Sequence, residues 1–129
     1  MSGSVILAGG GSGGHLSPGL AVAERLHAME TGLEPVFACS NRSIDRAMLE
    51  GAGARFEVIS AAPLVRSPGG LLRMVRSNLR GTRQAEALLD SSGASTVVAL
   101  GGFVSVPVVR AALRRSVRVL LLNLSLIHI

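Results

Sequence analysis

The sequence predicts an α/β domain with a Rossmann-like, open parallel sheet and helices on both faces. Short apolar segments alternate with longer segments of helical periodicity along the whole chain. The apolar segments are almost continuously hydrophobic, which is typical of parallel strands that are buried on both faces. With 129 residues, of which 48% are hydrophobic and 16% charged, the chain has the length and composition of one globular domain.

The first three elements are delimited by residues that favour the ends of helices and strands. Residues 4–8 form the first expected strand. Ser17 is a favourable N-cap, Pro18 suits the first turn of the helix that follows, and Gly32 ends this helix. Residues 34–40 form the second strand.

The middle of the chain repeats this alternation. Asn41 is expected to cap a helix over residues 42–50, and residues 54–60 form the third strand. After a proline-containing loop, a long helical pattern covers residues 69–91, with an expected break near Gly81.

The last elements surround a second glycine turn. A strand over residues 95–100 runs into the pair of glycines at 101–102. Pro107 lies in the first turn of a helix that runs to about Arg115, and residues 117–124 form the fifth strand.

The end of the chain is unusual for a domain. From Val117 to Ile129 the sequence is almost wholly apolar, and no capping helix follows the last expected strand. We therefore expect a domain over residues 1–124 and a doubtful tail over residues 125–129. Either the chain is one part of a larger protein or its last residues are not native.

Composition excludes several kinds of site. All thirteen basic residues are arginine, and the absence of lysine excludes both a Schiff-base lysine and the lysine of Walker-type phosphate loops. The aromatic residues are three Phe, so base stacking and a nucleic-acid partner are not expected. Cys39 is the single cysteine and is expected to be a small buried residue. No apolar run reaches the ~20 residues of a membrane-spanning helix.

The loop after the first strand has the spacing of phosphate-binding loops. Gly9, Gly11 and Gly14 fit the pattern G-x-G-x-x-G between a strand and a helix, where backbone N–H groups and the helix N-terminus bind an anion. A dinucleotide site would also require an acidic residue at the end of the second strand. Glu34 lies at the beginning of that strand, and Arg42 is only weak support for a 2′-phosphate site. A dinucleotide-binding domain is therefore an alternative interpretation.

His15 lies where this loop meets the helix. A neutral imidazole there can act as a general base, and a charged one can bind phosphate. A third interpretation is that His15 only caps its own loop.

Two segments, AGGGSGGHLSPGLAVAERL (residues 8–26) and LGGFVSVP (residues 100–107), carry a resemblance to a known family. Together they resemble the N-terminal half of the bacterial peptidoglycan N-acetylglucosaminyltransferases of glycosyltransferase family 28. The resemblance extends from Val5 to about Leu122. It implies one half of a GT-B architecture, in which two Rossmann-like domains face a cleft. The N-terminal domain binds the lipid-linked acceptor, and a C-terminal domain, missing from this chain, binds UDP-N-acetylglucosamine (UDP-GlcNAc).

The resemblance also implies a reaction. GlcNAc is transferred, with inversion, from UDP-GlcNAc to undecaprenyl-diphospho-N-acetylmuramoyl-pentapeptide, so that lipid I becomes lipid II. UDP-GlcNAc is a co-substrate, and neither a cofactor nor a metal is expected; the sequence has no Asp-x-Asp motif and no His cluster. The implied location is peripheral, on the cytoplasmic face of the cell membrane. This chain alone is expected to be inactive.

The glycine loops are implied to bind the acceptor diphosphate. The residues that match the family's motifs are Gly10, Gly11, Ser12, Gly13, Gly14 and His15 in the first loop, and Gly101, Gly102, Phe103, Val104, Ser105 and Pro107 in the second. Ser105 either donates its hydroxyl to the ligand or caps its helix, and the two roles are compatible. Asn123 stands where the family usually has an acidic residue, and we take it as a further acceptor-site residue.

The long helix carries two stripes that suit a membrane surface. The basic stripe consists of Arg73, Arg76, Arg80 and Arg83. The apolar stripe beside it consists of Leu71, Leu72, Val75 and Leu79. No acidic residue lies between Glu57 and Glu86, which favours contact with anionic headgroups over an ordinary solvated helix face.

One further alternative concerns the assembly. Some lipid-linked GlcNAc transferases are split into two chains, so the chain could be a stand-alone acceptor-binding subunit that recruits a donor half to the membrane. Such halves normally carry a clear membrane segment, which this sequence lacks.

Overall fold

The computed structural model describes residues 3–10, 16–62 and 67–122, over which strands and helices alternate. The strands are β1 (Gly3–Gly9), β2 (Leu33–Cys39), β3 (Phe56–Val58), β4 (Ala94–Gly101) and β5 (Arg118–Leu121). The helices are α1 (Leu16–Ala28), α2 (Ser43–Gly51), α3 (Pro68–Ser92) and α4 (Ser105–Arg114).

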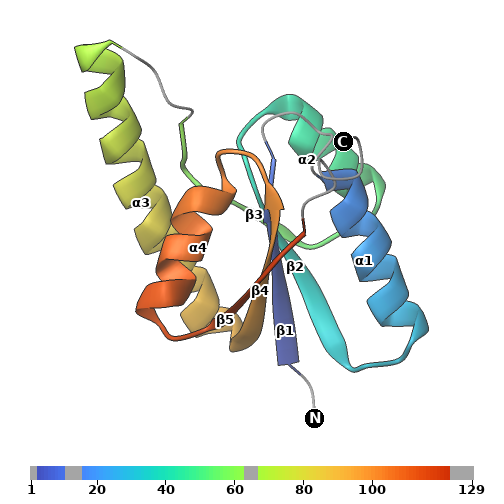
Figure 1. Cartoon of the computed structure of the whole chain (residues 1–129). Coiled ribbons are helices and arrows are strands. Elements are labelled where there is room, and N and C mark those ends of the chain that lie inside the picture. Colours follow the sequence, from blue (N-terminus) through green and yellow to red (C-terminus); the bar gives the residue numbers. More distant parts are fainter. Residues whose placement is uncertain (1–2, 11–15, 63–66, 123–129) are drawn as a thin grey trace, which may run out of the picture.

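The strands form one parallel sheet in the order β3-β2-β1-β4-β5. Helices α1 and α2 cover one face of the sheet, and α3 and α4 cover the other (Figure 1). The predicted fold class, an open parallel sheet with helices on both faces, is confirmed. Because all strands run the same way, their carboxyl ends lie along one edge, which is the edge where such sheets bind ligands.

The core has two layers, one on each face of the sheet. Along β1, Val5 and Leu7 face the layer under α1 and α2, whereas Ile6 and Ala8 face the layer under α3 and α4. All four are buried. This explains why the strand is continuously apolar: both faces of a central parallel strand are covered.

Helix α3 is continuous through Gly81, where the sequence predicted a break. The glycine is needed for contact and not for a turn: a Cβ at Gly81 would collide with the carbonyl oxygen of Ser60. Ser60 is also tied to this helix by its N–H, which donates to Gln84 Oε1 (2.7 Å), and by its hydroxyl, 2.8 Å from that of Ser77. Residues 77, 81 and 84 share one helix face, so the chain after β3 lies directly on α3.

The other expected boundaries differ by a few residues. α1 begins at Leu16 and not after Ser17, because the Leu16 side chain is fully buried in the core under α1. α2 has Arg42 at its N-cap and not Asn41, with no side-chain cap hydrogen bond. β3 and β5 are shorter than expected, with three and four residues, since both are edge strands that pair on one side only.

The two halves of α3 have different surroundings. In the C-terminal half, Ala85, Leu88 and Leu89 are buried against the sheet and α4. Glu86 there forms ion pairs with Arg114 (2.6 Å) and Arg115 (3.3 Å) at the end of α4. The N-terminal half extends past α4, away from the body of the domain (Figure 1).

Cys39 is fully buried at the end of β2, as predicted. Burial, reinforced by the nearby Asp45 and Glu57 carboxylates and opposed by Arg46, raises the pKa of its thiol from 9.0 to about 12. The chain has no Tyr and no Lys, so few other side chains titrate in this range.

This shift predicts a loss of stability in alkali. Between pH 9 and pH 12 the Cys39 thiol ionises in the unfolded chain but not in the folded one, so the free energy of unfolding falls by about 1.4 kcal/mol per pH unit. Urea unfolding at pH 8, 9, 10 and 11 measures this slope. Cys39→Ala is expected to remove most of it, and an equal slope in that variant would contradict the prediction.

Candidate functional site at the carboxyl edge of the sheet

The two glycine turns begin at the ends of neighbouring strands. β1 and β4 are paired, and the last residues in register are Gly9 and Gly101. The backbone then adopts positive φ angles at Gly10 (135°), Gly101 (112°) and Gly102 (83°), which only glycine adopts without strain. The two turns therefore begin next to each other, at the ends of paired strands.

The first turn begins in a tightly packed position. A Cβ at Gly9 would lie 2.9 Å from Cβ of Leu100, and one at Gly10 would collide with Oδ2 of Asp45. Because both residues are glycines, the chain after β1 can pack closely against Leu100 and Asp45. A larger residue at either position would push the chain away from them.

A buried carboxylate stands beside this turn, and the sequence analysis did not single it out. Asp45, in the first turn of α2, is fully buried, and its Oδ2 accepts hydrogen bonds from both the N–H (3.2 Å) and the hydroxyl of Ser40. These bonds fix the chain between β2 and α2. The sequence did contain a signal for this contact: an acidic residue in the first turn of a helix, five residues after a serine at the end of a strand.

The second turn is fixed by its own serine. Ser105 is the first residue of α4, and its hydroxyl donates to the carbonyl oxygen of Gly102 (2.7 Å). Of the two roles expected for Ser105, capping is wrong, because the N-cap is Val104 and no side chain caps the helix. The hydroxyl instead closes the turn that presents Gly101 and Gly102. Val104 and Pro107 are buried, so they position the start of α4.

A contact connects the chain after β2 with the second turn. The guanidinium carbon of Arg42 lies over the Phe103 ring, 5.5 Å from its centroid. Phe103 is partly buried and packs against the core cluster under α3 and α4.

Several predicted site residues lie outside the described residues. These are Gly11, Ser12, Gly13, Gly14, His15 and Asn123, together with the expected tail over residues 125–129. The roles assigned to His15 and Asn123 stay predictions.

Both predicted stripes on α3 are exposed. The apolar side chains of Leu71, Leu72, Val75 and Leu79 are between 42% and 56% exposed, although a helix face of this kind is normally covered. Arg73, Arg76, Arg80 and Arg83 are exposed as well, and none of the four has an ion pair among the described residues. The N-terminal half of α3 is thus an apolar surface flanked by positive charge.

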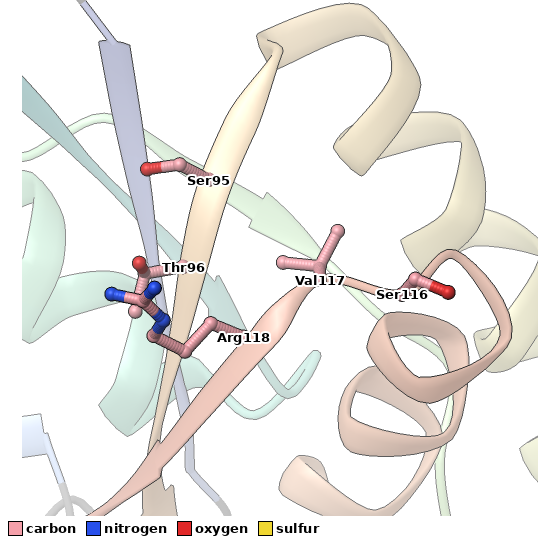
Figure 2. A pocket seen from close by; sticks show the side chains of 5 residues that line it. All are labelled: Ser95, Thr96, Ser116, Val117 and Arg118. Atoms are coloured by element: carbon pink, nitrogen blue, oxygen red, sulfur yellow. The ribbon is translucent and has the colours of Figure 1, made fainter.

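A hollow lies at the opposite edge of the sheet, where β4 and β5 begin. Figure 2 shows the side chain of Arg118 beside Thr96 on neighbouring strands, with Ser116 and Val117 in the approach to β5. This hollow is at the amino ends of the strands and has no part in the predicted site.

Two kinds of feature are absent from the described parts of the chain. Within those ranges no group of three or more His, Cys, Asp or Glu residues is placed to hold a metal ion. Over the same ranges no helix has the length and apolarity to cross a membrane.

The chain matches the family model described as "Glycosyltransferase family 28 N-terminal domain" over residues 5–121. Two similar relatives are named UDP-N-acetylglucosamine--N-acetylmuramyl-(pentapeptide) pyrophosphoryl-undecaprenol N-acetylglucosamine transferase. The one from Pelobacter propionicus is 40% identical over 115 residues, which cover 88% of this chain and 30% of the relative. The one from Mycobacterium tuberculosis is 38% identical over 110 residues, covering 84% of this chain and 27% of the relative. The chain therefore spans less than a third of the length of these relatives.

A solved structure with the same fold is that of Acinetobacter baumannii MurG. It superposes with a TM-score of 0.76 at 24% sequence identity, over 92% of this chain and 34% of that one. This similarity confirms the fold predicted from the sequence, one half of a GT-B architecture.

Proposed function

Because the chain belongs to glycosyltransferase family 28 and has the fold of its N-terminal domain, we propose that it is the acceptor-binding part of a lipid-linked N-acetylglucosaminyltransferase. The proposed acceptor is undecaprenyl-diphospho-N-acetylmuramoyl-pentapeptide, and the proposed product is lipid II. The names of the relatives support this choice of acceptor and sugar. We propose that UDP-GlcNAc binds mainly to protein outside this chain, either a C-terminal domain or a donor-half partner.

The observation that carries the proposal is the pair of glycine turns on adjacent strands. Gly10 opens one turn and Gly101 and Gly102 form the other, at the edge where α1 and α4 begin. Backbone N–H groups and helix N-termini favour anions. Two such turns side by side suit the two phosphates of a diphosphate better than they suit a single phosphate.

The proposed chemistry is a single displacement. The 4-hydroxyl of the muramoyl sugar attacks the anomeric carbon of UDP-GlcNAc, the new glycosidic bond forms with inversion, and UDP leaves with the bonding electrons. The hydroxyl proton passes to a base. His15 is proposed either as that base or as a phosphate ligand, in line with its place between the first turn and α1. No metal or cofactor is part of the proposal.

We further propose that the N-terminal half of α3 lies on the cytoplasmic face of the cell membrane. Exposed leucines suit the acyl edge of the bilayer, and exposed arginines suit anionic headgroups. The acceptor is lipid-linked, so a protein that binds it has to work at this surface.

Dinucleotide binding is not proposed. Glu34, the acidic residue of β2, is the second residue of that strand and forms an ion pair with Arg55 (2.9 Å). It lies at the amino edge, away from the glycine turns.

His15→Ala tests the proposed function in a full-length transferase that carries this domain. Transfer of labelled GlcNAc from UDP-GlcNAc to a short-chain lipid I analogue is expected to fall about a hundredfold, the usual effect of losing an acid–base group. Circular dichroism is expected to show an unchanged thermal midpoint. Near-normal transfer by the variant would show that His15 has no role in the reaction. Absence of transfer in the unmodified enzyme would contradict the proposed function itself.

A further inference from the structure

The hollow at the amino edge of the sheet has a polar wall that two neighbouring strands build together. Ser95 and Thr96 lie near the start of β4, and Arg118 is the first residue of β5. Thr96 and Arg118 are partners in the register of the two strands, so their side chains leave the sheet on the same side. Figure 2 shows the Arg118 guanidinium beside Thr96, on the side of β4 toward which the Ser95 hydroxyl also points. Ser116 and Val117 line the rest of the hollow, and the Ser116 hydroxyl points away from Arg118.

An irregularity in β4 explains why two consecutive hydroxyl groups share one side of the strand. Residues that follow one another in a regular strand point to opposite faces. Consecutive residues of β1 lie opposite Ala94 and Thr96, so Ser95 is skipped in the pairing. Such a bulge turns a side chain out of the regular alternation, and bulges are common next to binding sites. The bulge therefore brings the Ser95 hydroxyl to the side of Thr96 and Arg118.

These three polar side chains have no partner in the parts of the chain that the structure describes. There, the Ser95 and Thr96 hydroxyls form no hydrogen bond, and the Arg118 guanidinium forms neither a hydrogen bond nor an ion pair. The two arginines at the end of α4, by contrast, form ion pairs with acidic residues of α3. Ser95 and Arg118 are exposed and Thr96 is half-buried, so a ligand from solution can reach all three.

Two hydroxyls beside a guanidinium form a set of donors that suits a phosphate group. The planar N–H groups of arginine match a pair of phosphate oxygens, and each hydroxyl can donate to a remaining oxygen. A carboxylate has only two oxygens, so it cannot use the guanidinium and both hydroxyls equally well. The net charge of +5 also favours an anion over a cation.

We propose that Ser95, Thr96 and Arg118 bind a phosphate group at the amino edge of the sheet. A phosphate held there contacts both β4 and β5. Strand β5 has four residues and pairs on one side only, so this bridge fixes the edge strand to the sheet. The proposal does not rest on the proposed function, because it uses no residue of the carboxyl edge.

Two sources share this ligand chemistry, the free phosphate ion and a small phosphate monoester. A lipid headgroup suits the site less well. The free half of α3, which we propose lies on the membrane, projects beyond the opposite end of the sheet (Figure 1). The ligand is therefore expected to come from solution.

Titration of the full chain with three probes tests the proposal. Sodium phosphate, glycerol 1-phosphate and sodium acetate are added at constant ionic strength, and the dissociation constants are obtained from the amide NMR shifts of β4 and β5. Acetate is expected to bind about tenfold more weakly than the phosphates, because it loses contacts with the hydroxyls. The thermal midpoint is expected to rise with phosphate concentration, since the ligand bridges two strands of the folded state only.

Variants of the three side chains test their separate contributions. Arg118→Gln is expected to weaken phosphate binding about tenfold, the effect of losing a charge-assisted contact. Thr96→Val and Ser95→Ala are each expected to weaken it about threefold, the effect of losing one neutral hydrogen bond. In all three variants the stabilisation by phosphate falls along with the affinity.

Two matched controls separate the site from general effects. Arg110→Gln makes the same change of charge on the exposed face of α4, and Ser116→Ala removes a hydroxyl that lines the hollow but points away from Arg118. Both variants are expected to bind phosphate as the unmodified chain does. Thermal midpoints measured without ligand separate binding from folding.

The possible outcomes decide for or against the site. No binding by the unmodified chain, or acetate binding as tight as phosphate binding, overturns the proposal. Equal losses in Arg118→Gln and Arg110→Gln overturn it as well, because net charge alone then attracts the anion. If Arg118→Gln does not fold, Ser95→Ala and Thr96→Val decide: unchanged affinity in both overturns the proposal.

The two phosphate probes identify the source of the ligand. Tighter binding of sodium phosphate supports a site for the free ion, and tighter binding of glycerol 1-phosphate supports a site for a phosphate monoester. Transfer of GlcNAc is not measured in this titration, so a failure here leaves the proposed function as it stands.

Discussion

Gly81→Ala is expected to lower the free energy of unfolding by about 3 kcal/mol, a large effect for one methyl group on a helix. The added Cβ would collide with the carbonyl oxygen of Ser60 and would also lie 3.2 Å from Cγ2 of Ile59. A backbone carbonyl does not rotate away as a flexible side chain does. Either α3 or the chain after β3 has to move, and movement breaks the hydrogen bonds of Ser60 with Gln84 and Ser77.

Urea unfolding followed by circular dichroism at 222 nm measures this effect, since the chain has no Trp for fluorescence. Gly69→Ala is the matched control, because a Cβ at Gly69 has no atom within 4 Å. That variant is expected to be as stable as the unmodified chain or more stable by up to about 1 kcal/mol, from its better helix propensity. Equal stabilities for the two variants would show that α3 does not touch Ser60.

Arg76→Glu combined with Arg80→Glu is expected to abolish binding to anionic vesicles. Each basic residue near an anionic surface contributes about 1 kcal/mol, so reversing two charges removes about 4 kcal/mol, or about a thousandfold in affinity. Both residues are exposed on the N-terminal half of α3, beside the exposed Leu72 and Leu79. Sedimentation with vesicles of phosphatidylglycerol and phosphatidylcholine measures the bound fraction.

Arg25→Glu combined with Arg118→Glu provides the control, with the same change in net charge on other parts of the surface. These residues lie at the end of α1 and the start of β5, and their reversal is expected to weaken binding far less. Raising the salt concentration is expected to weaken binding of the unmodified chain, because ions screen the headgroups. Equal losses in the two double variants would mean that total charge, and not the α3 surface, determines binding.

The alternation of strands and helices was predictable because it depends on local pattern. Strand β1 is apolar at every position from Val5 to Ala8, which marks a central parallel strand before any partner is known. Glycines at the ends of β1 and β4 indicated the turns. Positive φ angles favour glycine, so such turns can be recognised from their glycine content.

The parts that could not be predicted depend on contacts between distant residues. Gly81 reads as a helix breaker when only its neighbours are considered, and its actual reason lies 21 residues earlier, at Ser60. Arg42 and Phe103, which are in contact, lie 61 positions apart in the sequence. Their contact depends on the order of the strands in the sheet, which local sequence patterns do not determine. Position alone left two roles open for the Ser105 hydroxyl, donation to a ligand or capping of the helix, and it could not show that this hydroxyl donates to the carbonyl oxygen of Gly102.

The projection of α3 beyond the domain has a consequence for how substrate is found. The helix is 25 residues long, roughly 37 Å, and only its C-terminal half is buried against the sheet and α4. Its free half begins at the same end of the molecule as the carboxyl edge of the strands (Figure 1). If that half rests on a bilayer, the glycine turns are held close to the plane in which diphosphate headgroups move. The search for the acceptor then takes place by diffusion within a surface, and its rate depends on the density of acceptor in the leaflet instead of on a concentration in solution.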